Sequence, residues 1–165
     1  MYSKILKCRG CQSENIRSVL DLGEQTLSGV FRSINLDGII SGPLALVSCK
    51  ECTLVQLEHS YPLGEMYNEG YGYRSGVTKY MTLHLKGILD FALSKVELRP
   101  GSYVLDIGSN DGTLLAQYRG DGIAKIGIDP VAKKYLHLYP KEAKVVTEFF
   151  DEKAYFGLPK KRHRL

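Results

Sequence analysis

The sequence of 165 residues predicts an α/β protein in which a small cysteine-containing module of strands and turns precedes the first strands and helices of an incomplete parallel sheet. Two observations carry this prediction. All four cysteines fall in two pairs before residue 53, and after residue 102 an apolar strand runs into a glycine-containing turn followed by alternating helix and strand patterns. The composition, 44% hydrophobic and 24% charged, is typical of a folded globular chain.

The sequence indicates neither a membrane span nor a secretory signal. A membrane helix needs about 20 consecutive apolar residues, and no run approaches that length. The amino terminus has one basic residue followed by two apolar ones, which is too short for the apolar region of a signal peptide. We therefore expect a cytoplasmic protein with no membrane partner.

The cysteines form two identically spaced pairs, Cys8 with Cys11 and Cys49 with Cys52, separated by 37 residues. Two residues between cysteines allow both sulfurs of a tight turn to face one ion, so two such pairs supply a complete tetrahedral thiolate set. The alternatives are disulfides, which a reducing compartment disfavours, and a redox dithiol, which needs only one pair. We expect zinc in a structural role, because four thiolates leave no coordination position open.

Residues 1–70 are predicted to form this zinc-binding module. The segment between the cysteine pairs mixes short apolar stretches with glycine and proline, which favours strands and turns over long helices. Short strands are expected at 44–47 and 53–57, on either side of the second pair. The result resembles a zinc ribbon. Its sequence has no basic stripe interleaved with aromatic residues, so we do not expect nucleic acid as a partner.

Residues 71–100 are predicted to connect the module to the sheet. Apolar residues recur at helical spacing from Val77 to Ala92, which predicts one long helix that packs against the sheet, with Ser75 as its cap. Just before this helix lies a polar aromatic cluster that contains Tyr71, Tyr73 and Ser75. Clefts between modules often hold substrates, and tyrosine offers both a stacking face and a hydroxyl group. A packed linker is the alternative.

Residues 101–150 are predicted to begin a ligand-binding α/β domain. The strand after Gly101 ends in Asp106, Gly108, Asn110 and Gly112 at alternate positions. In such sheets ligands bind at the carboxyl ends of the strands, where glycine lets the backbone approach them. A second strand ends in Asp129, 23 residues after Asp106, where a carboxylate can accept ribose hydroxyls.

The order of elements in this domain is strand, helix, strand, helix, strand. Pro130 is expected to begin a helix that continues to about residue 138, and residues 144–147 read as the third strand. The loop lacks the G-x-G-x-x-G spacing of a dinucleotide site. The alternative to a cofactor site is that Asp106 and Asp129 are turn and cap residues of a generic α/β unit. Residues 151–165, which end in a basic run from Lys160 to Arg164, are expected to be a disordered tail.

These motifs together resemble the S-adenosylmethionine-dependent sugar C-methyltransferases that carry an amino-terminal zinc-binding domain and act on nucleotide-linked keto-deoxysugars. The resemblance covers nearly residues 5 to 150. It runs through both cysteine pairs, Asp21-Leu-Gly-Glu-Gln, Gly42-Pro-Leu-Ala-Leu-Val-Ser-Cys49, Cys52-Thr-Leu-Val-Gln-Leu57, Tyr71-Gly-Tyr-Arg-Ser75, His84, Val104-Leu-Asp-Ile-Gly-Ser-Asn-Asp-Gly112 and Glu148-Phe-Phe150.

The resemblance implies a class I methyltransferase, Rossmann-like sheet and an S-adenosylmethionine cofactor. It implies that Asp106, Gly108, Asn110 and Asp129 contact the cofactor, with Gly112 completing the motif, and that Tyr71, Tyr73 and Ser75 border the active site. It also implies a reaction in which a base removes a proton next to the sugar ketone and the enolate carbon then accepts the methyl group. Asn110 stands where the first motif of class I methyltransferases, acidic-x-Gly-x-Gly-x-Gly, has its middle glycine.

A larger departure lies beyond Phe150. Family members continue with further strands, the residues proposed as catalytic bases and a carboxyl-terminal domain, and this sequence stops resembling them soon after residue 150. We therefore expect a truncated chain whose catalytic residues are unknown, inactive alone or completed by a second chain that carries the missing half. The alternative function is a non-catalytic zinc-binding interaction module or remnant.

Overall fold

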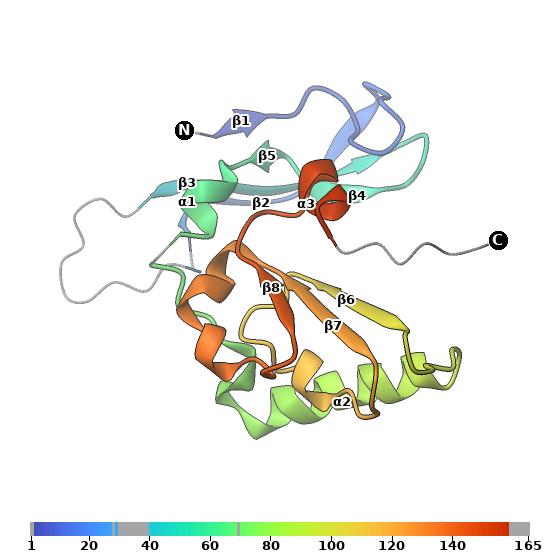
Figure 1. Ribbon diagram of the computed structural model, residues 1–165. Helices are drawn as coiled ribbons and strands as arrows, with labels where there is room; N and C mark the ends of the chain where they lie inside the picture. The colour runs from blue at the N-terminus through green and yellow to red at the C-terminus, as the bar shows by residue number, and fades with distance from the viewer. Residues whose placement is uncertain (1, 28, 30–39, 69, 159–165) are drawn as a thin grey trace. The chain divides into compact units, whose positions relative to one another are not determined.

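A computed structural model describes residues 2–27, 29, 40–68 and 70–158. The chain forms two compact units, Met1–Gly72 and Tyr73–Leu165, which are described separately. Figure 1 shows strands in both units and a long helix in the second. Among the described residues, no helix has both the length and the apolar character that crossing a bilayer requires.

The first unit is built from strands and turns, as the sequence predicts, and its strands pair in antiparallel sheets. The larger sheet has the order β2-β3-β4, with β2 at Ile16–Thr26, β3 at Ser41–Cys49 and β4 at Val55–Leu57. A second pair joins β1, Ser3–Lys4, to β5, His59–Ser60, and a short helix α1 follows at Leu63–Met66. Part of the segment between the cysteine pairs lies outside the described residues.

Strand β3 supplies the core of the first unit. Its side chains alternate, so that Ala45, Val47 and Cys49 are at most 4% exposed. Such alternation is typical of a strand that buries one face. The predicted strand at 44–47 is thus the centre of a longer strand that leads directly into the second cysteine pair.

The second unit contains the predicted parallel sheet, with the order β6-β7-β8. The strands are β6 at Tyr103–Ile107, β7 at Ala124–Ile128 and β8 at Lys144–Val146, and both pairings are parallel. The structure therefore has the predicted order: a four-cysteine module of antiparallel strands, then a parallel sheet with helices. The core of this unit centres on Val104, Leu115, Ala132 and Tyr139.

The long helix α2 occupies Lys79–Leu93 and differs from the prediction at its start and along its face. Its cap is Thr78, whose hydroxyl accepts a hydrogen bond from the Met81 amide, whereas Ser75 begins a separate 3₁₀ turn, Ser75–Val77. Only Leu89 is buried on this helix, and Tyr80 is 79% exposed. The apolar spacing therefore predicts the helix correctly. It also predicts a buried apolar face, whereas the described residues leave most of that face exposed or only half-buried.

The other helices of the second unit are shorter than the sequence predicts. A 3₁₀ turn at Leu115–Gln117 follows the glycine loop, and the helix expected from Pro130 is two 3₁₀ turns, Pro130–Lys134 and Leu136–Leu138. The backbone of Tyr135, with φ −121° and ψ 13°, leaves the helical region between them. This break carries the chain to Tyr139, whose side chain enters the core.

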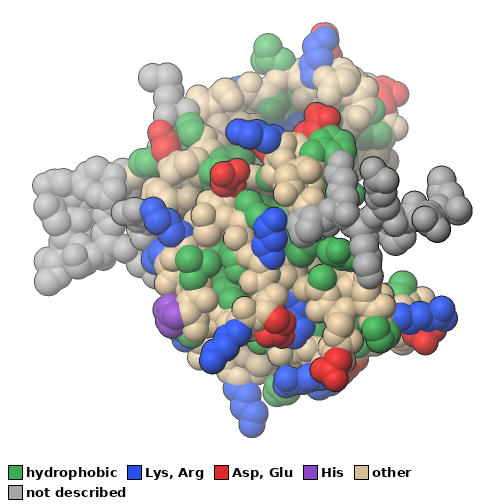
Figure 2. Space-filling view, in the orientation of Figure 1, with side chains coloured by type: hydrophobic (Ala, Val, Ile, Leu, Met, Phe, Trp, Pro, Cys, Tyr) green, Lys and Arg blue, Asp and Glu red, His purple; other side chains and the backbone are tan. Residues whose placement is uncertain are grey.

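The segment after residue 150 corrects another expectation. Residues Glu152–Phe156 form a helix, α3, capped by the Asp151 carboxylate, which accepts a hydrogen bond from the Ala154 amide at 2.6 Å. The expected disorder therefore does not apply to this part, and the basic run lies outside the described residues. On the face seen in Figure 2, Lys and Arg side chains are interspersed with Asp and Glu side chains.

Candidate metal centre and cofactor loop

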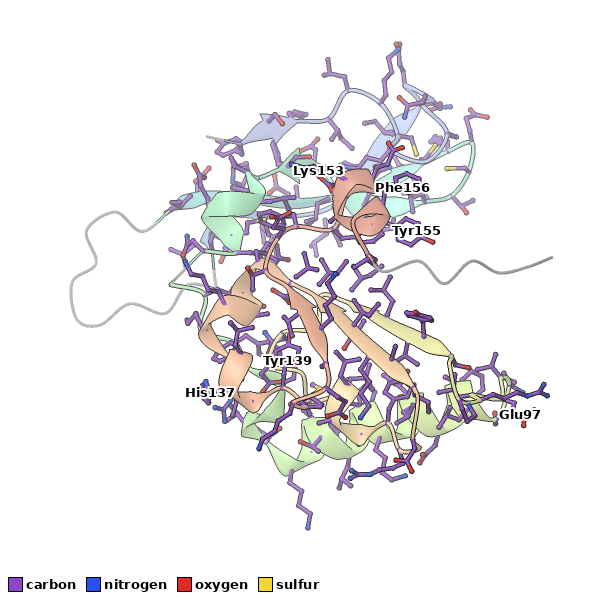
Figure 3. All side chains as sticks on the ribbon, in the orientation of Figure 1. Glu97, His137, Tyr139, Lys153, Tyr155 and Phe156 are labelled. Atoms are coloured by element: carbon purple, nitrogen blue, oxygen red, sulfur yellow. The ribbon has the colours of Figure 1, made fainter. Side chains whose placement is uncertain are left out.

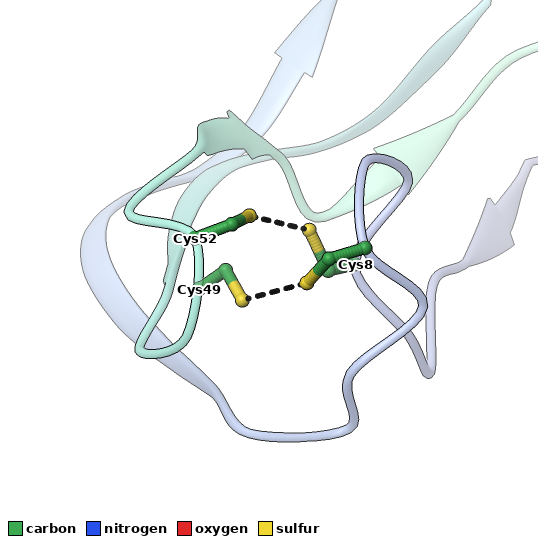
Figure 4. A group of neighbouring side chains, drawn as sticks. Cys8, Cys49 and Cys52 are labelled. Carbon is green, nitrogen blue, oxygen red and sulfur yellow. Dashed lines mark hydrogen bonds between the residues drawn. The ribbon is translucent and has the colours of Figure 1, made fainter.

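The two cysteine pairs meet at one point of the first unit. The four sulfurs all lie within 4.8 Å of one another, and the Cys8–Cys52 and Cys11–Cys49 sulfur pairs are each 3.5 Å apart (Figure 4). Four thiolates about 2.3 Å from a central ion stand at separations of this size, so the donor set fits tetrahedral zinc. Cys8 and Cys49 are buried, and Cys11 and Cys52 are exposed.

Each cysteine pair sits in a turn of the same shape. The Gln12 amide donates to the Cys8 carbonyl at 2.9 Å, and the Thr53 amide donates to the Cys49 carbonyl at 3.1 Å. Both Gln12 and Thr53 have φ of 64°, a left-handed conformation that ends the turn. The repeat of one backbone geometry at both pairs is expected of two turns built to hold one ion.

Backbone amides stabilise the thiolate form of the first cysteine in each pair. Hydrogen bonds from the Cys11 and Gly10 amides, with one from the Gln56 side chain at 3.2 Å, lower the pKa of Cys8 to about 6. The amides of Cys52 and Glu51 likewise lower the pKa of Cys49. Since thiolate is the form that binds metal, these donors favour the metal-binding form of Cys8 and Cys49.

The glycine loop of the second unit is held by its own backbone. The Gly108 amide donates to the Ile128 carbonyl at 2.8 Å, and the Gly112 amide donates to the Ser109 carbonyl at 2.8 Å. Gly108, Asn110 and Gly112 all have positive φ, of 76°, 49° and 76°. The unusual backbone that the sequence pattern predicts is therefore present at each of these three positions.

Asp129 anchors this loop to the end of the next strand. Its Oδ2 accepts a hydrogen bond from the Asn110 amide at 2.8 Å, and its Oδ1 accepts one from the Val131 amide at 2.7 Å. Asp129 is thus a cap and loop support, the role that the alternative interpretation gave it. Each carboxylate oxygen can accept a second hydrogen bond, so capacity for a ligand hydroxyl remains.

Tyr139 supports the loop from the core side (Figure 3), and the sequence offers no signal for this role. Its hydroxyl donates to the Asn110 carbonyl at 2.9 Å and lies 2.8 Å from the Ser109 hydroxyl. Burial raises the pKa of Tyr139 to about 12, so the group remains a donor. A Cβ on Gly112 would stand 2.8 Å from the Tyr139 ring, which explains why glycine is needed there.

Tyr139→Phe should lower the free energy of unfolding of the second unit by about 1–2 kcal/mol, because it leaves the Asn110 carbonyl and the Ser109 hydroxyl without their buried partner. Tyr135→Phe is the control, since that ring packs against the same core and its hydroxyl has no hydrogen bond among the described residues. Denaturant unfolding checks the difference, and equal stability of both variants would contradict this role for Tyr139.

The surroundings of Asp106 destabilise the charged form of its carboxyl group. Burial, followed by repulsion from Asp129, raises its pKa from 3.8 to about 6. Among the described residues no hydrogen bond reaches its carboxylate. A partly buried carboxylate without a partner at the end of a strand is a typical functional-site feature, since a ligand that supplies a donor or positive charge relieves the strain.

The raised pKa of Asp106 makes stability depend on pH. The folded state binds the proton of Asp106 more tightly than the unfolded state, so the contribution of this residue to stability is greatest below about pH 4, falls as pH rises to about 6, and is level above that. Asp106→Asn removes the charge and should stabilise the second unit at pH 7 by about 2 kcal/mol. Unfolding curves from pH 4 to 7 test this, and an unchanged pH profile in the variant would contradict it.

The hydrogen bonds of the loop indicate which ligands suit it. The amides of Gly108, Ser109, Asn110, Gly112 and Thr113 all donate to acceptors within the protein. They are therefore not arranged to cradle a phosphate, as a dinucleotide site requires. Open space faces the Cα of Gly108, and the Asp106 carboxylate is repelled by that of Asp129, so the loop suits a ligand with hydroxyl, amino or cationic groups.

The residues predicted to border the substrate do not all belong to one unit. Tyr73 and Ser75 lie against the glycine loop, where the Asn110 side chain donates to the Tyr73 carbonyl and accepts from the Ser75 amide. Tyr71 belongs to the first unit, where it lines a cavity of about 290 Å³ together with Tyr61, Tyr67 and Met66. The second unit thus brings together Tyr73, Ser75, Asp106, Gly108, Asn110, Gly112 and Asp129.

Comparison with known families finds a match within the first unit. Residues 8–67 match the model of the Methyltransf_13 family, whose description reads "Putative zinc binding domain". The match begins at Cys8 and includes both cysteine pairs, which the fold brings to one point. The chain therefore has a four-cysteine zinc site within a segment that is similar to this zinc-binding domain.

Comparison with curated proteins shows a distant relationship over more of the chain. The sequence is 27% identical over 126 residues to C-methyltransferase NovU of Streptomyces niveus. The match covers 75% of this chain and 30% of the relative, so the chain spans about a third of that protein's length. This distant homology supports the resemblance to C-methyltransferases stated from the sequence.

Proposed function

We propose that the second unit binds S-adenosylmethionine and that the chain is a component of a C-methyltransferase acting on a nucleotide-linked keto-deoxysugar. The observation that carries this proposal is the prebuilt glycine loop, with its amides directed inward and the strained Asp106 carboxylate beside it. The distant likeness to a protein named as a C-methyltransferase supports the reaction class. The sugar and the nucleotide rest on the sequence resemblance alone.

The residues of the second unit have distinct parts in this proposal. Gly108 lets the cofactor approach the backbone, because no side chain occupies the space in front of it. Asp106 offers a carboxylate that accepts no hydrogen bond from the described residues. Asp129 holds the loop through the Asn110 amide, and its oxygens can each accept a further hydrogen bond from a ribose hydroxyl. S-adenosylmethionine supplies the methyl group to be transferred.

In this proposal the zinc ion has a structural role and not a catalytic one. Four thiolates complete the coordination of zinc, so the ion has no position left for substrate. Its turns join β3 and β4 to the amino-terminal turn, and Arg9 hydrogen-bonds both the Leu57 carbonyl, at 2.6 Å, and the Ser60 hydroxyl, at 2.7 Å. The metal thus stabilises a unit whose hydrophobic core is small.

Transfer of isotopically labelled methyl from S-adenosylmethionine to a nucleotide-linked keto-deoxysugar tests the proposal. The assay uses the zinc-loaded chain alone and with the carboxyl-terminal two thirds of a related C-methyltransferase added as a second polypeptide. Labelled sugar in either reaction supports the proposal. Cofactor binding without transfer in both would limit the function to binding, and neither binding nor transfer would favour a non-catalytic zinc module.

A further inference from the structure

Two side chains of the glycine loop, those of Asn110 and Asp111, hold the segment that precedes helix α2. The Asn110 Oδ1 accepts a hydrogen bond from the Ser75 amide at 2.9 Å, and its Nδ2 donates to the Tyr73 carbonyl at 3.1 Å. The Asp111 Oδ2 accepts one from the Gly76 amide at 2.8 Å. Three hydrogen bonds therefore join residues 73–76 to two adjacent residues of the loop.

These contacts are buried and closely fitted. Asn110 is 7% exposed and Asp111 is 3% exposed, so water replaces their partners poorly. The second oxygen of Asp111 accepts from the Thr113 amide at 3.1 Å, which fixes the carboxylate's orientation. A Cβ on Gly76 would stand 2.8 Å from the Asp111 Oδ2, so the segment approaches the loop as closely as glycine permits.

The same loop residue is also tied to the second strand. The Asn110 amide donates to Asp129, while the Asn110 side chain holds Tyr73 and Ser75. Any ligand that orders the loop therefore acts on a residue that orders the segment as well. Coupling of this kind is reciprocal, because each event changes the free energy of the other.

We propose that Asn110 and Asp111 are positioning residues that fix the Tyr73–Gly76 segment to the cofactor loop, so that cofactor binding and order in this segment are coupled. This rests on the proposed function and deepens it. The Asn110 side chain then serves the segment, and not the cofactor as the resemblance implies, while the Asn110 backbone remains part of the loop. The segment carries Tyr73 and Ser75, the substrate candidates of the second unit.

Asn110→Gly tests the proposal, because glycine tolerates the φ of 49° at this position and removes only the two side-chain hydrogen bonds. Amide hydrogen exchange followed by NMR should show the Ser75 amide exchanging about tenfold faster in the variant. Asn110→Asp keeps an acceptor for that amide and should bring its exchange back toward the wild-type rate. Unchanged exchange at Ser75 in Asn110→Gly would overturn the proposal.

The coupling is measured with S-adenosylhomocysteine as the probe. A saturating amount should slow exchange at Ser75 and Gly76 in the wild-type chain, and should fail to slow it at Ser75 in Asn110→Gly although calorimetry shows that the variant still binds the probe. Equal slowing in both chains would overturn the coupling alone. Lack of binding by the wild-type chain would overturn the proposed function together with the coupling, so the two failures are distinguishable.

Discussion

Cys49→Ser is expected to release zinc and unfold the first unit. The substitution removes one of four thiolates from a site whose sulfurs lie within 4.8 Å of one another, and the remaining three cannot close the coordination shell. Structural zinc sites contribute on the order of 10 kcal/mol to the folding of small domains, far more than this unit's core can replace. Metal analysis and amide exchange across β2, β3 and β4 measure the two effects.

Lys50→Ser is the matched control for Cys49→Ser, because Lys50 is an exposed residue of the same turn. It should retain zinc and the wild-type exchange pattern. Removing zinc from the wild-type chain with a chelator should reproduce the effect of Cys49→Ser, and adding zinc back should reverse it. Full protection of β3 amides in the metal-free chain would contradict a structural role for the ion.

Gly108→Val should weaken S-adenosylmethionine binding by on the order of 100-fold. The valine side chain would occupy the open space in front of the loop, and crowding of this kind costs about 1–3 kcal/mol. The positive φ of 76° adds backbone strain, which lowers the stability of the second unit as well. Calorimetric titration measures affinity, and denaturant unfolding shows that the tested sample is folded.

Gly87→Ala is the control for Gly108→Val. Gly87 lies within α2, with open space around its Cα and no positive φ. Alanine there should stabilise the helix by about 1 kcal/mol and leave cofactor affinity unchanged. Equal affinity of the wild-type chain and Gly108→Val would place the ligand elsewhere.

The sequence predicts the parts of this structure that depend on local patterns. Paired cysteines two residues apart predict the zinc site. The short apolar stretches on either side of the second pair and the apolar strand before Gly108 predict strands in both units. The positive φ of Gly108 and Gly112 also follows from the pattern of the loop. Spacing alone suffices in these cases because neighbouring residues determine the geometry.

The contacts that position the loop could not be predicted in this way. Ser75 and Asn110 are 35 residues apart, and Ser109 and Tyr139 are 30 apart, so no local pattern marks either hydrogen bond. Helix α2 is capped by Thr78 and not by Ser75, because Ser75 begins a separate 3₁₀ turn whose first amide donates to the distant Asn110 side chain. The helix after Pro130 breaks at Tyr135, and Tyr139 then reaches the core, which only tertiary packing decides.

Calorimetric titration of the zinc-loaded chain with S-adenosylmethionine tests the central claim most directly. We expect saturable one-to-one binding with a dissociation constant between about 1 µM and 1 mM. Affinity should be weakened on the order of 100-fold in Gly108→Val and unchanged in Gly87→Ala. A folded, zinc-loaded wild-type chain that takes up no S-adenosylmethionine would contradict it.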